Sequence, residues 1–326
     1  MTELVLTKNR KTFGWWLDKT GTIIAFVFIV SLFSILSPYF GTMSNIENLF
    51  IQISPLLIAA LGITFVNMAG ESDLSLGGTF GLGVTLFCGF LRSGINPIYC
   101  VFLVIAICTA FGAINGLLVA YSKLSSFIVT TAVMFIAMGV ERTYNGGFSI
   151  WIRNKEVLDF ANGSFLGISN FVIISISFFV MTLILLHQTK FGVHLQSVGE
   201  SYETSNMMGI SVKKLKFVSF CFASSFYGIA GVLYAMRSSG AIVYSGQKVL
   251  LPALAVTFVA KTVLGAKRPN VFGILIGALI LGVINNAFTL LGVEFFYIPI
   301  IQGLVLVIAA AISTMNKRDI QQENLN

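Results

Sequence analysis

The chain has 326 residues, of which 56% are hydrophobic and only 10% are charged, whereas a soluble domain carries about 25% charged residues. This composition excludes an ordinary soluble protein and indicates an integral membrane protein. The net charge of +7 does not indicate nucleic-acid binding, because the basic residues stand in short connections and form no basic face with base-stacking aromatic residues.

Apolar runs recur along the chain and are continuous rather than alternating, which predicts membrane-spanning helices and not a barrel. We expect an all-α, polytopic helix bundle of about ten segments. A single membrane domain (20–314) would lie between an N-terminal segment (1–19) and a short tail (315–326). The predicted segments are 20–40, 48–69, 74–91, 97–120, 125–147, 168–188, 216–237, 248–265, 271–290 and 295–314.

The basic residues predict which ends of these segments face the cytoplasm. Cytoplasmic connections carry the excess of Lys and Arg, and both ends of the chain are basic, so both termini are expected to be cytoplasmic. Ten crossings satisfy this, and eight would as well. The terminal basic residues are Lys8, Arg10, Lys11, Lys19, Lys317 and Arg318. The first run lacks a small-residue cleavage site and is interpreted as a spanning helix rather than a signal peptide.

The second and third segments almost meet at Gly70-Glu71-Ser72-Asp73-Leu74-Ser75. Asp73 and Ser75 are suited to cap the helix that follows. Two interpretations are open: a discontinuous helix whose free amide end faces a polar solute, or a capped turn at the membrane surface.

Amides inside apolar segments include Asn115 in the fourth, and Asn285 and Asn286 in the ninth. Such amides usually bond to a neighbouring helix. The alternative is that they line a path for hydroxylated solutes, in which case Asp73 and Ser75 would belong to the same translocation path. Glycines four residues apart, at 112 and 116 and at 273 and 277, predict close helix packing.

A polar stretch, 189–215, separates the sixth and seventh segments and carries several lysines. Residues 200–208 are predicted to form two turns of helix that end at Gly209. Tyr202, Met207 and Met208 would give this helix an apolar contact patch. A short helix on the membrane surface can fit a groove on a partner; the alternative is a solvated loop.

No constellation indicates catalysis. His187 and His194 are expected to be structural, because no carboxylate or cysteine completes a metal set. The phosphate-loop, GxSxG and HExxH motifs are missing from the sequence. The four cysteines fall in apolar segments and form no CxxC pair, so they are expected to be buried. We expect no enzyme activity, metal or cofactor. Most segments also lack acids in their interiors, which disfavours ion-coupled transport.

Taken in order, these motifs resemble the permease subunits of ribose-type ABC importers, which carry ribose, xylose, galactose or autoinducer-2. Gly70, Asp73, Leu74 and Ser75 match a glycine-glycine-isoleucine-aspartate-leucine-serine signature, in which Glu71 and Ser72 depart from the pattern. The chain also departs from the family's pattern near the eighth segment. Pro252 stands there in place of an acidic residue, and Lys261 is a further departure. The other matching stretches are 115–119, 189–192, 198–200, 209–210, 228–233 and positions within 273–286.

The resemblance implies one half of a transport path in a bacterial plasma membrane, surrounded by lipid and paired with a second permease copy or a paralogue. Partner ATPase subunits would grip the coupling helix at 200–208 within the cytoplasmic 189–215 loop, and an extracytoplasmic binding protein would deliver a sugar or related polar solute. The coupling residues it implies are Gly199, Glu200, Glu203, Met207, Met208 and Gly209. The alternative functions are an ion-coupled carrier and, after that, a membrane enzyme or an assembly scaffold.

Overall fold

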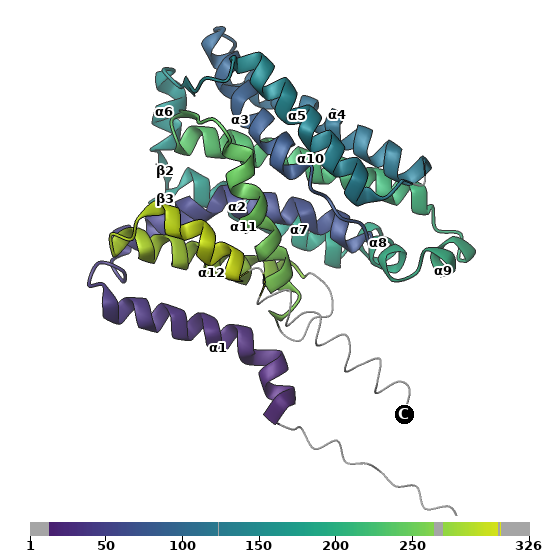
Figure 1. Ribbon diagram of the computed structural model, residues 1–326, viewed down its shortest axis with the longest axis horizontal. Helices are drawn as coiled ribbons and strands as arrows, with labels where there is room; N and C mark the ends of the chain where they lie inside the picture. Colours follow the sequence, from purple (N-terminus) through teal and green to yellow (C-terminus); the bar gives the residue numbers. More distant parts are fainter. Residues whose placement is uncertain (1–12, 123, 264–269, 306, 308–326) are drawn as a thin grey trace, which may run out of the picture.

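The computed structural model describes residues 13–122, 124–263, 270–305 and 307. Within them the chain is a bundle of helices with four two-residue strands (Figure 1). The long helices are α1 Phe13–Leu36, α2 Met43–Met68, α3 Leu76–Arg92, α4 Pro97–Tyr121, α5 Ser126–Asn145, α7 Asn170–His187, α10 Val212–Arg237, α11 Ser245–Ala260 and α12 Val271–Leu290. The short elements are β1 Ile150–Trp151, α6 Lys155–Ala161, β2 Ser164–Phe165, β3 Ile168–Ser169, α8 Lys190–Glu200, α9 Tyr202–Met207, β4 Gly240–Ala241 and η2 Phe295–Tyr297.

Six helices are long and apolar enough to span a membrane, namely α2, α4, α5, α7, α10 and α12; α3, α11 and the 21–36 part of α1 are shorter apolar helices. These nine coincide with nine predicted segments. The tenth, 295–314, and the basic terminal residues up to Lys11 and from Lys317 lie partly or wholly outside the described residues. The polytopic helical fold is therefore confirmed, whereas the number of crossings and the side of each terminus stay predictions.

The boundaries differ from the prediction where polar residues begin a helix. Helix α2 begins at Met43, five residues earlier than expected, because the side chain of Thr42 caps it by accepting a hydrogen bond from the Asn45 backbone. Helix α10 begins at Val212 and takes in Lys213 and Lys214. Hydropathy detects only the apolar part of such helices, so the predicted starts fall after the polar first turns.

Helix α10 lies at the centre and packs on α2, α3 and α4. Small residues allow the close approach: a Cβ atom at Gly112 of α4 would lie 2.4 Å from the Phe220 carbonyl oxygen of α10. A Cβ atom at Gly273 of α12 would likewise lie 2.5 Å from the Ala260 oxygen of α11. Both glycine pairs therefore serve helix packing, as predicted.

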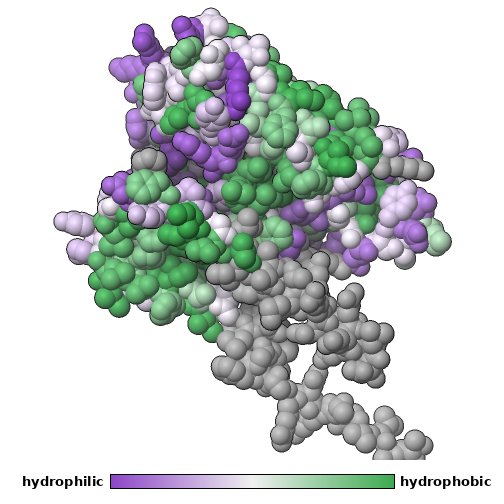
Figure 2. Space-filling model, in the orientation of Figure 1, coloured by the Kyte–Doolittle hydropathy of each residue, from purple (hydrophilic) through white to green (hydrophobic). Residues whose placement is uncertain are grey.

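The connections gather at two ends of the bundle. At the first, the α8–α9 end, the 69–75 connection lies against Gly199 and Lys216. At the second, the α6 end, β1 pairs antiparallel with β4, and the end of α3 lies beside 149–154. Figure 1 shows α8 and α9 on one side of the molecule, with α6, β2 and β3 on the opposite side. Figure 2 shows hydrophilic residues over both ends and hydrophobic residues between them.

Candidate functional site

The polar stretch 189–215 folds into two consecutive helices rather than a loop. Helix α8 ends at Glu200, and Ser201, in extended backbone, begins α9 by accepting a hydrogen bond from the Thr204 backbone at 3.2 Å. The prediction of one helix from Glu200 to Met208 is therefore wrong at its start, because Ser201 caps a new helix there. The predicted end of the helix is confirmed, because Gly209 adopts φ +77° just after α9 and the helix does not continue past it.

Helix α9 presents apolar side chains to its surroundings. Met207 is 87% exposed and Met208 is 73% exposed, while Tyr202 and Glu203 are also exposed. Ser205 is buried, and its carbonyl accepts a hydrogen bond from the Ile210 backbone at 3.0 Å. Flexible, exposed methionines suit a protein contact surface. We name Tyr202, Glu203, Met207, Met208 and Gly209 the α9 surface.

A hollow of about 380 Å³ lies beside the α9 surface. Its walls come from α8, from the turn after α9 and from the start of α10, and they combine apolar and basic groups. The lining residues include Phe191, His194, Met208, Ile210, Lys214 and Leu215. The hollow gives this end of the bundle a recess next to a protruding helix.

Helix α8 is held tightly against the 69–75 connection. A Cβ atom at Gly199 would lie 2.2 Å from the Met68 carbonyl oxygen, and Gly70, with φ +77°, faces the Gly199 backbone. Only residues without a side chain allow this approach. Gly199, predicted as a coupling residue, therefore has a packing role inside the subunit, and contact with a partner at this residue stays a prediction.

An ion pair joins the same connection to α10. The Lys216 ammonium contacts the Glu71 carboxylate, and both side chains are partly buried. The ammonium also stands 5.6 Å from the centroid of the Tyr202 ring in α9, within the range of a cation–π contact. The 69–75 connection, α9 and α10 thus come together at the ammonium group of Lys216.

Asp73 is almost wholly buried next to this pair. Its Oδ1 accepts hydrogen bonds from the Ser75 backbone at 2.8 Å and the Ser75 hydroxyl at 2.6 Å, and its Oδ2 accepts one from the Tyr227 hydroxyl at 2.9 Å. Burial raises the pKa of the Asp73 carboxyl, against the lowering effect of these bonds. Ser75 is the N-cap residue of α3, as predicted, but its hydroxyl makes no capping hydrogen bond and donates to the Asp73 carboxylate. Asp73 accepts from the Ser75 backbone in the turn before the helix and does not cap α3 itself.

The three amides have different surroundings. Asn286 exchanges two hydrogen bonds of 2.9 Å with Asn45 of α2, and Asn285 accepts one from Gln302 at 3.3 Å. Asn115 is buried, and neither its amide nitrogen nor its oxygen has a hydrogen-bond partner among the described residues. Two amides thus bond across the bundle, and no hydrogen bond links them to Asp73 or Ser75 in the described part of the chain. Their role in a path stays a prediction.

Sequence reasoning missed two pairings. The Glu71–Lys216 pair spans 145 positions and has no local signal. Glu141 of α5 is buried against α3, where it accepts a hydrogen bond from the Thr85 hydroxyl at 3.2 Å. The fold brings Glu141 beside Gly81, where an added Cβ would lie 2.7 Å from its carboxylate, and the sequence carries no signal of this contact.

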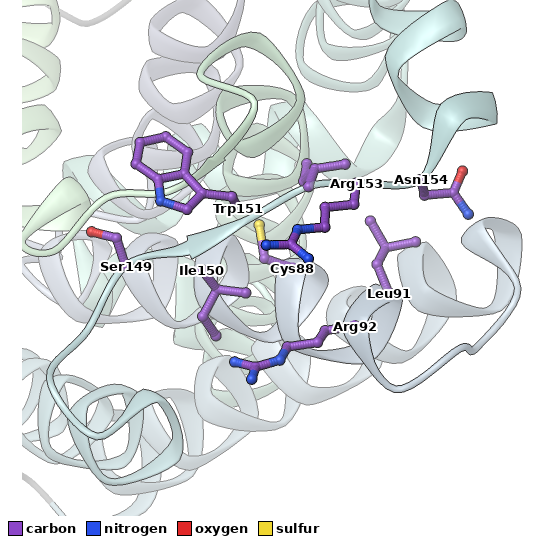
Figure 3. Close-up of a pocket in the computed structure, with 9 residues that line it drawn as sticks. Cys88, Leu91, Arg92, Ser149, Ile150, Trp151, Arg153 and Asn154 are labelled. Atoms are coloured by element: carbon purple, nitrogen blue, oxygen red, sulfur yellow. The ribbon is translucent and has the colours of Figure 1, made fainter.

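A pocket of about 440 Å³ opens at the α6 end (Figure 3). It lies between the end of α3 and the 149–154 segment, and the side chains of Arg92 and Arg153 occupy the space between them. Both arginines are exposed, and neither forms an ion pair with a carboxylate in the described part of the chain. The pocket therefore offers two guanidinium groups, which suit carboxylates.

The described residues contain neither a cluster suited to a metal ion nor a disulfide. No three His, Cys, Asp or Glu side chains in them gather in a way that would hold a metal ion. All four cysteines are free thiols; Cys88, Cys100 and Cys108 are buried, as expected, and Cys221 is half-buried.

Comparison with known proteins agrees with the membrane fold. The family model described as a branched-chain amino acid transport system permease component matches residues 45–310. The chain is 33% identical to the ribose import permease of Bacillus subtilis, with 94% of this chain and 97% of the relative covered. It is 30% identical to the L-arabinose ABC transporter permease of Azospirillum brasilense (94% and 91% covered). It is 27% identical to the galactose/methyl galactoside import permease of Salmonella typhimurium (94% and 97%). No solved structure is a significant match.

Proposed function

Because the chain belongs to the family of permease components of branched-chain amino acid transport systems, we propose that it is the membrane subunit through which an ABC importer moves a sugar or related polar solute. The chain is a multi-pass membrane permease and not an enzyme, as its family and its full-length relatives establish. The resemblance to ribose-type permeases is thereby confirmed.

The family description names branched-chain amino acids, whereas the relatives that match over nearly the whole chain carry the names of sugars. We give more weight to the relatives, because their similarity extends over more than nine-tenths of both chains. A sugar or another polyhydroxylated solute is therefore the proposed cargo.

The observation that carries the coupling part of the proposal is the α9 surface. A six-residue helix stands at one end of the bundle with Met207 and Met208 exposed, and Glu203 lies in its first turn. Short helices with apolar anchors dock into grooves on partners. Partner ATPases would take this surface, with Glu200 and Gly209 at its borders. Lys190, Lys213 and Lys214 at the same end favour the cytoplasmic side for it.

The α6 end would then face outward and receive the binding protein. Arg92 and Arg153 in the outer pocket support this assignment, because exposed guanidinium groups recognise carboxylates on a partner surface. A second permease copy or a paralogue would complete the transport path.

Substitution of the two methionines tests the docking assignment. In the complex with ATPases and binding protein, the double variant Met207→Glu/Met208→Glu should abolish co-purification of the ATPases, because charged groups would enter an apolar groove. Met207→Leu/Met208→Leu is the matched control, since it alters the same two exposed side chains but keeps both of them apolar. If the double variant retains its ATPases, α9 is not the docking helix.

The alternative is an ion-coupled carrier, which would need acids within the bilayer. Among the described spanning helices, Glu141 of α5 is a buried acid, and Thr85 already donates a hydrogen bond to it. Replacement of Glu141 by Gln separates the two functions. An ABC permease should retain ATP-driven uptake with the amide, whereas a carrier that binds its ion at Glu141 should lose gradient-driven uptake.

A further inference from the structure

We propose that the Glu71–Lys216 ion pair is the link through which movement of α9 reaches the helices of the transport path, so that these two residues position α3 and α5 in response to the ATPases. The inference rests on the proposed function and extends it to a specific pair of residues. Glu71 is one of the two residues at which the chain departs from the ribose-type signature.

The pair lies where α9 and the 69–75 connection come together. Lys216 is in the second turn of α10, shortly after α9, and Glu71 is in the connection between α2 and α3. Their side chains are 18% and 16% exposed, so solvent and salt screen their attraction less than that of a surface pair. The same ammonium lies over the ring of Tyr202, the first residue of α9. Displacement of α9 therefore displaces the charge that holds Glu71.

The residues after Glu71 connect it to the bundle. The Ser72 backbone donates to the Ser126 hydroxyl at 3.2 Å, and the Leu74 backbone donates to the Thr130 hydroxyl at 3.1 Å. Both acceptors lie in the first turns of α5, and α3 begins two residues after Leu74. A pull on Glu71 thus acts on the starts of α3 and α5 together.

The bond between Asp73 and Tyr227 connects the same segment to the middle of α10. Because Lys216 belongs to α10 as well, the Glu71–Lys216 and Asp73–Tyr227 contacts attach the 69–75 connection to α10 at two positions along that helix. If the Glu71–Lys216 pair is lost, the Asp73–Tyr227 bond still attaches the connection to the bundle, but the charge that lies beside α9 no longer holds it. The pair is therefore suited to transmission rather than to holding the fold together.

The neighbouring Gly70–Gly199 contact has a different mechanical property. Two backbones in van der Waals contact resist being pushed together but scarcely resist being separated. An ion pair resists separation, because the attraction between opposite charges falls slowly with distance. The glycine contact can thus transmit a push from α8, whereas the ion pair transmits a pull.

The test uses the full complex of permease, ATPases and binding protein in proteoliposomes, with labelled ribose, arabinose and galactose as probes. The measured quantity is the amount of sugar taken up per ATP hydrolysed. The variants Glu71→Gln and Lys216→Gln should each lower this ratio about fivefold. The exchange Glu71→Lys/Lys216→Glu should restore it to within about twofold of the original, because it restores an attractive pair. Co-purification of ATPases checks assembly in each case.

Lys213→Gln is the matched control. Lys213 lies in the first turn of α10, three residues before Lys216, and its ammonium stands 5.5 Å from the centroid of the Tyr121 ring rather than beside a carboxylate. Its removal should leave the ratio unchanged. The inference is overturned if the single variants keep the ratio, or if the charge exchange fails to assemble or to restore it. If the unaltered complex takes up no labelled sugar with ATP, the proposed function fails instead.

Discussion

The two ends of this bundle are held together in different ways. At the α8–α9 end, the connections are locked to one another by a backbone contact at Gly199, by the Glu71–Lys216 pair and by the bonds of Asp73. At the α6 end, β1 pairs with β4 and the Ile152 backbone donates to the Ser239 carbonyl at 3.0 Å, while Arg92 and Arg153 are left exposed in an open pocket. Under the proposed function, the first end would transmit movement into the helices and the second would receive a partner.

The largest effect should come from a substitution that opens the locked end. Gly199→Val places a side chain where a Cβ atom already lies 2.2 Å from the Met68 oxygen, so α8 must move away from the 69–75 connection. We expect about 2–3 kcal/mol of destabilisation and loss of ATP-driven uptake. Thermal unfolding in detergent and uptake assays measure the two effects.

Gly139→Ala is the control for that change. Gly139 belongs to helix α5, and a Cβ atom added to it would have no neighbour within 4 Å, so alanine should be tolerated there. Equal loss of stability in both variants would contradict the close contact at Gly199.

A second substitution tests whether the α6 end receives a partner. The double variant Arg92→Glu/Arg153→Glu reverses the charge of the outer pocket and should weaken stimulation by the binding protein about tenfold or more. The fold should be unaffected, because both side chains are exposed. Titration of the binding protein against ATPase activity gives the apparent affinity. Unchanged affinity would remove the pocket from the docking surface.

A third change measures how firmly the α6 end is held within the bundle. Asn286→Leu leaves the buried Asn45 without its partner across α2 and α12, which should lower stability by about 2 kcal/mol. The double variant Asn45→Leu/Asn286→Leu should recover part of that loss, because no amide is then left unpaired. Additive losses in thermal unfolding would mean that the two amides act independently.

The smallest effect should come from the turn after α9. Gly209 has φ +77°, and a Cβ atom there would have no neighbour within 4 Å, so Gly209→Ala introduces backbone strain of about 1 kcal/mol without a clash. We expect a modest loss of stability and a small decrease in ATPase co-purification, since the α9 surface is displaced slightly. A loss as large as that of Gly199→Val would mean that the turn, and not the glycine contact, holds this end.

The sequence predicted what is local and periodic. Long apolar runs predicted the spanning helices, four-residue glycine spacing predicted the contacts of Gly112 and Gly273, and the turn at Gly209 followed from its residue type. It did not predict that Ser201 divides the polar stretch into α8 and α9, because both sides of the division have helical composition.

Contacts between residues far apart in the sequence could not be predicted from the sequence alone. The Glu71–Lys216 and Asn45–Asn286 pairs each join residues more than a hundred positions apart, and a single sequence contains no signal of such proximity. The bond between the Tyr227 hydroxyl and Asp73 has the same origin, because these residues lie 154 positions apart and only the fold brings them together.

The central claim is that this chain is a gate without an energy source of its own, moved from its α8–α9 end. Uptake of labelled ribose, arabinose and galactose into proteoliposomes tests it most directly, with the permease reconstituted alone and with its ATPases and binding protein. The account predicts concentrative uptake only in the complete complex and only with ATP. Concentrative uptake by the permease alone under an ion gradient would contradict it.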